Sequence, residues 1–236
     1  MPWISRDHGA PPLTSFTPRE RRLIRRLSTP LAVQRYLNAL PYNTEEPRET
    51  LRTFRGVVQR GTAHCLEAAL FAAVVMEQHG RPPLVLSFES VDLLDHVIFV
   101  YQTSRGWGSI ARSRDPGLHG RRPVFATPRA LALSYADPYI DFTGEIRAYA
   151  VVDLRVLGRY DWRRSERNVW KVERLLIDWP HRRIRMSRRR VRILRRWYRR
   201  FRTLYPELKP IDYRGRERWT ELPKPFMRAE GLGADD

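Results

Sequence analysis

The chain has 236 residues, with 44 Lys and Arg against 26 Asp and Glu, a formal net charge of +18 and a single cysteine. This length fits one domain with an extension, or two small domains, and the 42% hydrophobic content is enough for a packed core. One cysteine excludes an intramolecular disulfide and a cysteine-based zinc site. No apolar run is long enough to span a membrane and residues 1–12 lack a secretory core, so we expect a cytoplasmic protein without a transmembrane segment.

The sequence predicts helices before strands. Residues 1–17 are rich in Pro, Gly, Ser and Thr and are expected to form a flexible N-terminal segment. Helical patterns follow at 18–27, 30–40 and 51–59. Residues 63–79 are apolar almost all round and precede Gly80, which predicts a buried helix with a glycine stop.

Strand patterns dominate the middle of the chain. The runs 84–88, 93–102 and 107–112 are rich in β-branched and aromatic residues, and the short turn before Trp107 joins the last two into an antiparallel hairpin. Further elements are expected as a loop or short strand at 121–124, a helix at 128–135, a strand at 146–154, and a helix capped by Ser165 and carrying apolar residues from 169 to 179. We therefore expect an α+β domain over residues 18–180.

Cys65 is the leading candidate for chemistry. It lies at the first turn of the buried helix, where unpaired N–H groups and the helix dipole favour a thiolate. A nucleophilic cysteine also needs a histidine partner. His96 interrupts an otherwise apolar strand and is the best candidate, whereas His64 is expected to point away from Cys65 as its neighbour in a helix.

Residues 61–113 resemble the transglutaminase-like core of the papain-like cysteine enzyme superfamily. The matching pieces are HCLEAALFAA (64–73), DHVIFVY (95–101) and GWGSIARS (106–113). More closely, residues 29–180 look like an uncharacterised bacterial family of transglutaminase-like proteins. The resemblance implies a nucleophilic Cys65 at the start of a central helix packed on a small antiparallel sheet, with His96 on a following strand and an orienting residue on the next.

The orienting residue departs from that pattern. The resemblance places it four residues after Trp107, where this chain has Ala111, which cannot accept a hydrogen bond from an imidazole. Ser113 and Asp115 would share its face if the strand continued, because side chains alternate along a strand. The sequence leaves open a Cys–His dyad, a rearranged triad or a degenerate site.

Oxyanion stabilisation has two candidates. One is the main-chain N–H of Cys65 at the helix start. The other is Gln59, six residues before Cys65, whose spacing resembles the oxyanion glutamine of papain-like peptidases. With these groups the expected reaction is attack on an amide or ester carbonyl, followed by hydrolysis or amide transfer, on a peptide or other amide substrate and with no cofactor or metal.

Residues 181–236 form a basic C-terminal extension. Residues 181–202 carry twelve Arg and no acidic residue, which is two thirds of the net charge, beside an apolar stripe at helical spacing. This amphipathic segment could dock on the core with solvated arginines, bind nucleic acid or another polyanion, or lie on an anionic membrane surface. The polyanion-binding candidates are Arg188, Arg189, Arg192, Arg195, Arg196 and Arg199. A catalytically inactive scaffold that binds a polyanion or protein through this segment is the alternative to a thiol enzyme.

Overall fold

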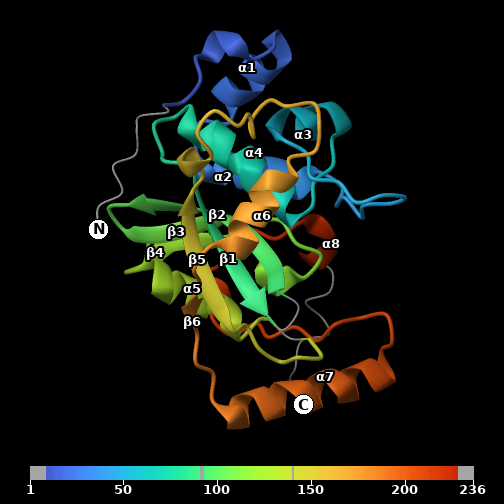
Figure 1. Cartoon of the computed structure of the whole chain (residues 1–236). Coiled ribbons are helices and arrows are strands. Elements are labelled where there is room, and N and C mark those ends of the chain that lie inside the picture. The colour runs from blue at the N-terminus through green and yellow to red at the C-terminus, as the bar shows by residue number, and fades with distance from the viewer. Residues whose placement is uncertain (1–8, 91–92, 140, 228–236) are drawn as a thin grey trace.

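A computed structural model of the protein describes residues 9–90, 93–139 and 141–227. Its centre is a six-stranded sheet in the order β4-β3-β2-β1-β5-β6, in which every neighbouring pair is antiparallel (Figure 1). The strands are β1 (Leu84–Ser90), β2 (Leu93–Thr103), β3 (Gly106–Ile110), β4 (Arg121–Phe125), β5 (Ala148–Asp153) and β6 (Arg182–Arg183). The expected α+β class is confirmed.

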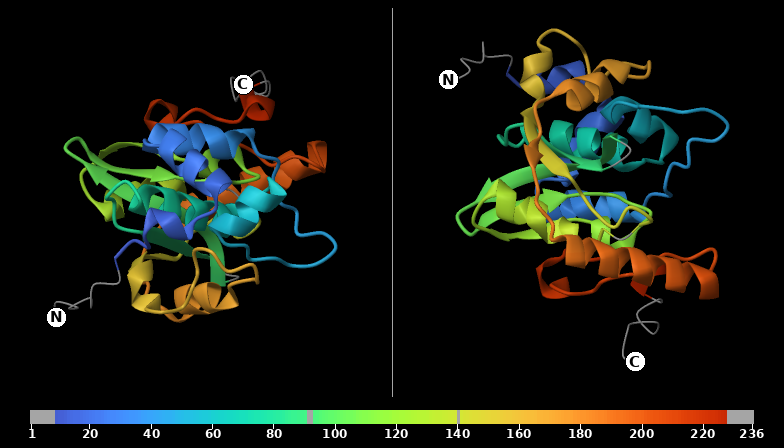
Figure 2. Two further views of the ribbon diagram at one scale, coloured as in Figure 1. Left: turned by 90° about the horizontal axis from the view of Figure 1, so that it is seen from above. Right: turned by 60° about the horizontal axis from the view of Figure 1, so that its bottom comes forward.

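Helices cover both faces of this sheet (Figure 2). They are α1 (Pro18–Arg26), α2 (Pro30–Ala39), α3 (Phe54–Arg60), α4 (Cys65–Glu77), α5 (Pro128–Ala136), α6 (Trp170–Asp178), α7 (Arg188–Leu204) and the short α8 (Lys224–Met227). Four of these helices begin after a threonine whose side-chain oxygen caps the helix, namely Thr17, Thr29, Thr53 and Thr127.

Strand β2 separates two hydrophobic cores. Val97 and Phe99 face the first core, which contains α1 to α4 and α6, while Ile98 and Val100 face the second, which contains α5. Helix α4 lies inside the first core and most of its residues are buried, which explains its uniformly apolar sequence. The buried helix therefore fixes the position of its first residue, Cys65, relative to the sheet.

The predicted β2–β3 hairpin is present, and its turn requires a glycine. Gly106 has φ +128°, and a Cβ atom there would lie 2.6 Å from the main-chain oxygen of Phe125 on the neighbouring strand. Only glycine satisfies both constraints. This turn holds β3 against β2 and sets where the chain leaves the sheet after Ile110.

Two local expectations differ from the structure. Within the described part of residues 1–17, Phe16 is buried and its ring packs edge-on against Phe54 at 5.7 Å, so residues 9–17 are tied to the core; residues 1–8 lie outside the described chain. Ser165 does not cap α6, whose N-cap position is Val169 without a side-chain cap. Instead, the main-chain oxygen of Ser165 accepts a hydrogen bond from the Thr53 hydroxyl.

The basic segment is not one continuous helix. Arg182 and Arg183 pair with β5 as β6, and α7 starts only after the cap Ser187. Helix α7 docks on the rest of the protein through Val191 and Leu194. No helix in the described ranges combines the length and the apolar composition needed to cross a membrane.

The chain after α7 also packs on the domain. Trp219 is buried, and its neighbour Thr220 donates its N–H to the Gly120 oxygen at 3.0 Å, beside the edge strand β4. The described part of residues 181–236 is thus joined to the α+β domain rather than separate from it, because an aromatic side chain far along the sequence fills a place in its core.

Candidate active site

Cys65 is the first residue of α4, and it is half-buried. It lines a cavity of about 150 Å³ together with His96, Tyr42, Ser113 and Asp115. The structure therefore brings together the predicted nucleophile, the predicted histidine and both candidates for an orienting residue. The remaining walls come from the η2 turn (Pro116–Leu118), the segment that follows α5 and the chain after α7.

The environment of Cys65 favours the thiolate. Burial alone raises the pKa of a thiol, but hydrogen bonds and charges from His64 and His96 outweigh burial and lower the pKa of Cys65 to about 5. The start of α4 adds the unpaired N–H groups and positive dipole end of a helix. An ionised sulfur beside an open cavity is the arrangement that a nucleophile needs.

His64 contacts Cys65, contrary to the expectation from sequence. His64 is the N-cap residue of α4 with φ −87° and ψ −176°, so it is not helical and its ring folds over the helix start. Its Nδ1 accepts the Leu66 N–H at 3.3 Å in the neutral state, whereas the charged ring donates to Cys65. Burial disfavours the charged ring, but Cys65, Glu67 and Glu45 together raise the pKa of His64 to about 9.

A main-chain carbonyl orients His96. The Nε2 atom of His96 lies 2.9 Å from the Leu118 oxygen, which can only accept, so Nε2 carries the proton and Nδ1 is the basic nitrogen. The ring also stacks on Phe88, with centroids 6.2 Å apart, and lies near Tyr135. Packing and one hydrogen bond therefore fix both the tautomer and the orientation of the imidazole that faces Cys65.

Ser113 and Asp115 do not take the orienting role expected for them. Strand β3 ends at Ile110, so the alternation that placed them on one face does not extend to residue 115. The Asp115 carboxylate pairs with Lys209 at 3.0 Å, and the Ser113 hydroxyl accepts the Asp115 N–H at 3.0 Å. The main-chain oxygen of Leu118 orients His96 instead, and no side-chain pattern in a sequence can reveal such a contact.

Ala111, the residue at the expected third position, serves a structural role. Both main-chain groups of Ala111 bond to the buried Gln34 carboxamide, its N–H to Oε1 at 2.9 Å and its oxygen to Nε2 at 2.8 Å. The carboxamide thus continues the hydrogen bonding of β3 where the sheet ends. The small, buried methyl of Ala111 packs in the second core.

A buried arginine holds the loop that carries the Leu118 carbonyl. Arg121 donates to the main-chain oxygens of His119 at 2.8 Å and Gly117 at 2.6 Å, on either side of Leu118. Its guanidinium lies between the rings of Tyr135, at 4.0 Å, and Trp219, at 4.7 Å. Burial lowers the pKa of Arg121 to about 10, which still leaves it charged at neutral pH.

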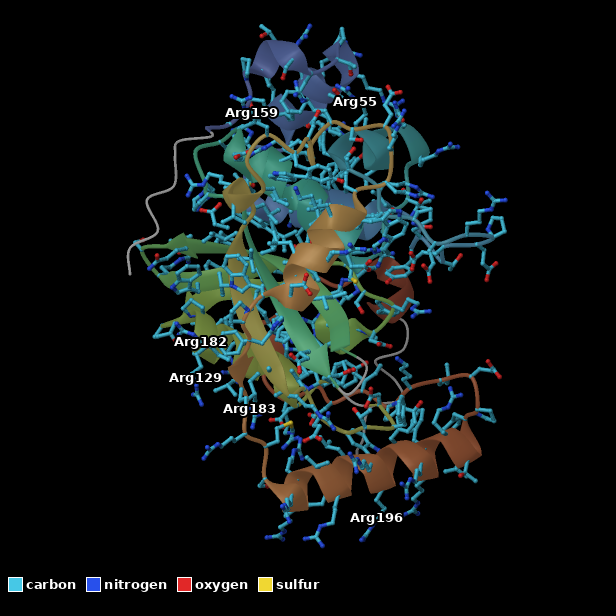
Figure 3. The ribbon with its side chains drawn as sticks, in the orientation of Figure 1. Arg55, Arg129, Arg159, Arg182, Arg183 and Arg196 are labelled. Atoms are coloured by element: carbon cyan, nitrogen blue, oxygen red, sulfur yellow. The ribbon has the colours of Figure 1, made fainter. Side chains whose placement is uncertain are left out.

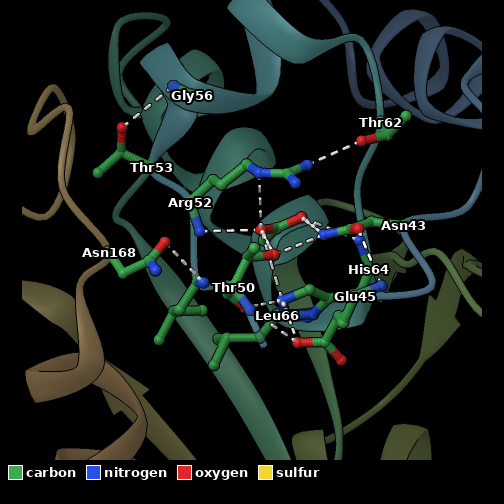
Figure 4. Close-up of polar contacts among 12 residues, drawn as sticks. Asn43, Glu45, Thr50, Arg52, Thr53, Gly56, Thr62, His64, Leu66 and Asn168 are labelled. Carbon is green, nitrogen blue, oxygen red and sulfur yellow. Dashed lines mark hydrogen bonds and ion pairs between the residues drawn. The ribbon is translucent and has the colours of Figure 1, made fainter. Parts of the chain in front are cut away.

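A second buried network fixes the helix start, and Figure 4 shows its contacts around Asn43, Thr50, Arg52 and His64. Its centre is Glu67, which is fully buried. One carboxylate oxygen accepts from the Thr50 hydroxyl at 3.0 Å and the Arg52 N–H at 2.9 Å, and the other accepts from Asn43 at 2.9 Å and the His64 N–H at 3.2 Å. Glu67 thereby ties the preceding loop to α4.

Tyr42 is a site residue that the sequence did not single out. Its phenol lines the cavity with Cys65, and the main-chain N–H of Cys65, the group expected to stabilise an oxyanion, is near enough to favour negative charge on the phenol oxygen. Burial and the neighbouring Cys65 charge raise the pKa of Tyr42 well above its usual range, so the phenol stays protonated and can donate. Gln59, in contrast, is exposed on α3 and is not among the residues that line the cavity. The structure does not bring it to Cys65.

The segment after α7 closes one side of the cavity. Lys209, Pro210 and Ile211 line it, and the Lys209–Asp115 ion pair joins this segment to the loop after β3. Asp212 is bonded to Arg190 of α7 at 3.1 Å, which anchors the segment at its other end. The basic extension therefore contributes a wall to the candidate site, a contact over more than ninety residues of sequence that the composition did not indicate.

The arginine candidates of α7 lie away from the cavity. Arg188, Arg189, Arg192, Arg196 and Arg199 are exposed, while Arg195 is half-buried and bonds to the Thr143 oxygen. None of these residues lines the Cys65 cavity. The basic surface and the candidate active site are thus two separate features.

Within the described ranges, no group of three or more His, Cys, Asp or Glu side chains is placed to hold a metal ion.

No protein-family model matches the chain. The search of curated proteins found no match either. The resemblance to transglutaminase-like proteins therefore stays a prediction.

Proposed function

We propose that the protein is a transglutaminase-like thiol enzyme that cleaves or transfers acyl groups at amide or ester bonds, with Cys65 as nucleophile and His96 as its acid–base partner. The observation that carries the proposal is the position of Cys65: at a helix start, with the pKa of its thiol lowered to about 5 by two imidazoles, and open to a cavity. The antiparallel sheet behind α4 agrees with the architecture that the resemblance implies.

The reaction follows from these positions. In the proposed step the Cys65 thiolate attacks the carbonyl carbon, and Nδ1 of His96 carries the proton that the leaving group will need. The bond to the leaving amine or alcohol then breaks, and His96 gives its proton to that group, which leaves a thioester on Cys65. Water or an amine, deprotonated by His96, attacks the thioester and restores the thiolate. Water completes hydrolysis and an amine completes acyl transfer.

Two donors would stabilise the oxyanion. An entering carbonyl oxygen would accept from the main-chain N–H of Cys65 and from the protonated Tyr42 phenol, since both residues line the cavity. Tyr42 is held beside Cys65 by the loop that Glu67 anchors through Asn43. Tyr42→Phe is therefore expected to slow acylation while leaving the pKa of Cys65 low, which separates oxyanion stabilisation from thiol activation.

Alkylation of Cys65 tests the proposal directly. Because the chain has one cysteine, a single carboxamidomethyl group detected by intact mass reports on Cys65 alone. The rate of reaction with iodoacetamide is expected to rise with pH around a midpoint near 5, against about 8.5 for an ordinary thiol. The midpoint is measured rather than the absolute rate. A thiolate of low pKa is intrinsically a weaker nucleophile, and this partly cancels the effect of its greater ionisation on the rate.

Histidine variants show which residue lowers the pKa of Cys65. His96→Gln is expected to raise the midpoint by about one pH unit or more, since it removes one of the two imidazoles that stabilise the thiolate. His79→Gln is the matched control, because His79 follows the opposite end of α4 and bonds to the Ile24 oxygen. A wild-type midpoint near that of a free thiol would refute the enzyme and favour the inactive scaffold. Circular dichroism checks that the variants fold, and the wild-type midpoint decides even if they do not.

A further inference from the structure

We propose that the exposed side of α7 is a docking surface for an anionic lipid bilayer, with the helix lying in the plane of the membrane. We define this outer face of α7 by its exposed residues, Arg189, Arg192, Ile193, Arg196, Arg199, Arg200 and Leu204. The inference goes beyond the proposed function and does not depend on it, since none of these residues lines the Cys65 cavity.

The first observation is the placement of the helix. Helix α7 lies along one end of the molecule, with its length open to solvent on the outer side (Figures 1 and 2). Its opposite side is fixed to the protein by the buried Val191 and Leu194 and by Arg190, which pairs with Asp137 and Asp212. The outer face is therefore presented by a docked helix, and binding would not need the helix to leave its place.

The second observation is uncompensated charge. Among the described residues, none of the five arginines of the outer face forms an ion pair with a carboxylate. Figure 3 shows Arg196 directed away from the body of the protein. Unpaired cations close together repel one another and attract an anionic surface, where counterions are released and each arginine adds to the attraction. The partner is therefore negatively charged.

The third observation selects a lipid surface from among polyanions. Ile193 and Leu204 are 48% and 66% exposed, and eleven residues, about three helical turns, place them on the same side of α7. The half-buried Trp197 lies between them on that side. A phosphate backbone would leave these aliphatic side chains in contact with water, whereas a bilayer takes up the apolar side chains and its headgroups contact the arginines.

The geometry of the surface agrees with this choice. Helix α7 has 17 residues and therefore presents a ridge of about 25 Å, which matches a helix lying at the level of the headgroups. The exposed apolar side chains continue beyond the helix, since Tyr205 and Leu208 are 44% and 47% exposed. Cations beside exposed apolar groups along one ridge are typical of interfacial helices.

Vesicle sedimentation tests the proposal with the full chain. The protein is expected to sediment with phosphatidylglycerol/phosphatidylcholine vesicles at low salt, to bind pure phosphatidylcholine vesicles much more weakly, and to be released by high salt. The charge variant Arg196→Glu/Arg200→Glu should weaken binding by about tenfold or more. The apolar variant Ile193→Ser/Leu204→Ser should also weaken it severalfold, because it removes the groups that enter the bilayer.

A matched control distinguishes the effect of the outer face from the effect of net charge. Arg22→Glu/Arg159→Glu changes the charge by the same amount at exposed positions on α1 and after β5. It should leave vesicle binding nearly unchanged. Equal loss in this control would overturn the proposal, as would failure of the wild-type protein to bind.

A nucleic-acid arm completes the test, using a duplex DNA oligonucleotide in the same buffer. If the charge variant loses binding to DNA and vesicles alike while the apolar variant binds vesicles normally, the outer face is a general polyanion site and the lipid assignment is wrong. All of the substituted side chains are exposed, so the variants should keep the wild-type circular dichroism spectrum.

Discussion

Helices α4 and α7 place charge and apolar surface in opposite ways. Helix α4 is buried along its length, and its one acidic residue near the start, Glu67, has every carboxylate contact satisfied. Helix α7 buries only Val191 and Leu194, and most of its nine arginines face solvent. Charge is scarce and fixed at the start of α4, whereas on α7 it is abundant and, among the described residues, most of the arginines lack a carboxylate partner.

The difference explains what each helix can do. A buried, satisfied network holds Cys65 and His64 in one geometry and lets nearby charges act through a low dielectric, so they shift pKa values strongly. Exposed arginines are screened by solvent and hold no such geometry, but they add up to a field that attracts an anionic surface. The first arrangement suits chemistry and the second suits docking.

The largest effect is expected from Glu67→Ala. The substitution removes the acceptor for four hydrogen bonds in a buried network and leaves the donors of Asn43 and Arg52 unsatisfied. We expect the free energy of unfolding to fall by roughly 3–5 kcal/mol, measured by urea denaturation. Glu67→Gln keeps the shape and one acceptor and should cost less. A loss below about 1 kcal/mol for the alanine variant would mean that the network does not hold the helix start.

The next largest effect is expected from Arg121→Lys. Lysine keeps the charge but not the planar fork that joins the Gly117 and His119 oxygens. We expect a loss of about 2–3 kcal/mol in unfolding free energy, because buried carbonyls lose donors. The iodoacetamide midpoint of Cys65 should also rise, since the loop no longer holds the Leu118 oxygen against His96. An unchanged midpoint in a folded variant would show that Arg121 serves stability alone.

The pH dependence of stability should carry the signature of Cys65. Its pKa is lowered in the folded state, so the thiolate stabilises the fold above the unfolded pKa of about 8.5, and this contribution is lost as pH falls through about 5. The raised pKa of His64 acts with opposite sign, stabilising the fold below about 6.5 and losing its contribution as pH rises through about 9.

Between about pH 6.5 and 8.5 the growth of the Cys65 contribution with pH is offset by the decline of the His64 contribution, so the net rise in stability from the pair occurs between pH 5 and 6.5. Urea denaturation of the wild-type protein and Cys65→Ala across this range gives the measurement. The difference in unfolding free energy between them should grow from pH 5 to 6.5. A difference that is constant or shrinks over this interval would contradict the thiolate–imidazolium pair.

A smaller effect is expected from Lys209→Ala, which breaks the ion pair between the segment after α7 and the loop after β3. The Lys209–Asp115 pair is partly exposed, so unfolding free energy should change by less than about 1 kcal/mol. Because Lys209 lines the cavity, its removal should admit iodoacetamide to Cys65 more readily and raise the alkylation rate severalfold without moving the pH midpoint. Glu207→Ala, an exposed position in the same segment that lies outside the cavity lining, is the control.

The smallest effect is expected from Arg196→Ala on the outer face of α7. The side chain is exposed and unpaired among the described residues, so unfolding free energy should change by no more than about 0.5 kcal/mol. Thermal or urea denaturation measures it. A larger loss would show that the arginines of this face stabilise the fold, and would count against a role for them in binding a partner.

Local signals in the sequence predicted most of the fold and the two central site residues. Periodicity and helix caps located most of the helices, and β-branched runs located β1 to β3, because these features act within a few residues. Cys65 and His96 were found because a cysteine at a helix start and a histidine in an apolar strand both need a physical explanation. Placing them at one cavity required the fold.

The sequence could not predict the other parts of the site. His64 contacts Cys65 because a cap residue departs from helical geometry, and helical spacing had argued against that contact. The acceptor for His96 is the main-chain oxygen of Leu118, which any residue would supply and no pattern marks. Tyr42 and Lys209 reach the cavity from segments whose positions depend on packing far along the chain.

By itself, the sequence determined the α+β class, the single candidate nucleophile and the uneven charge that places twelve arginines within residues 181–202. Composition and local periodicity are enough for these features, because each is set by neighbouring residues. Only the tertiary structure decided what orients His96 and that α7 docks through one side with its arginines outward. Those outcomes arise from contacts between residues distant in sequence, where the packing of the buried core selects one arrangement from the many that the sequence allows.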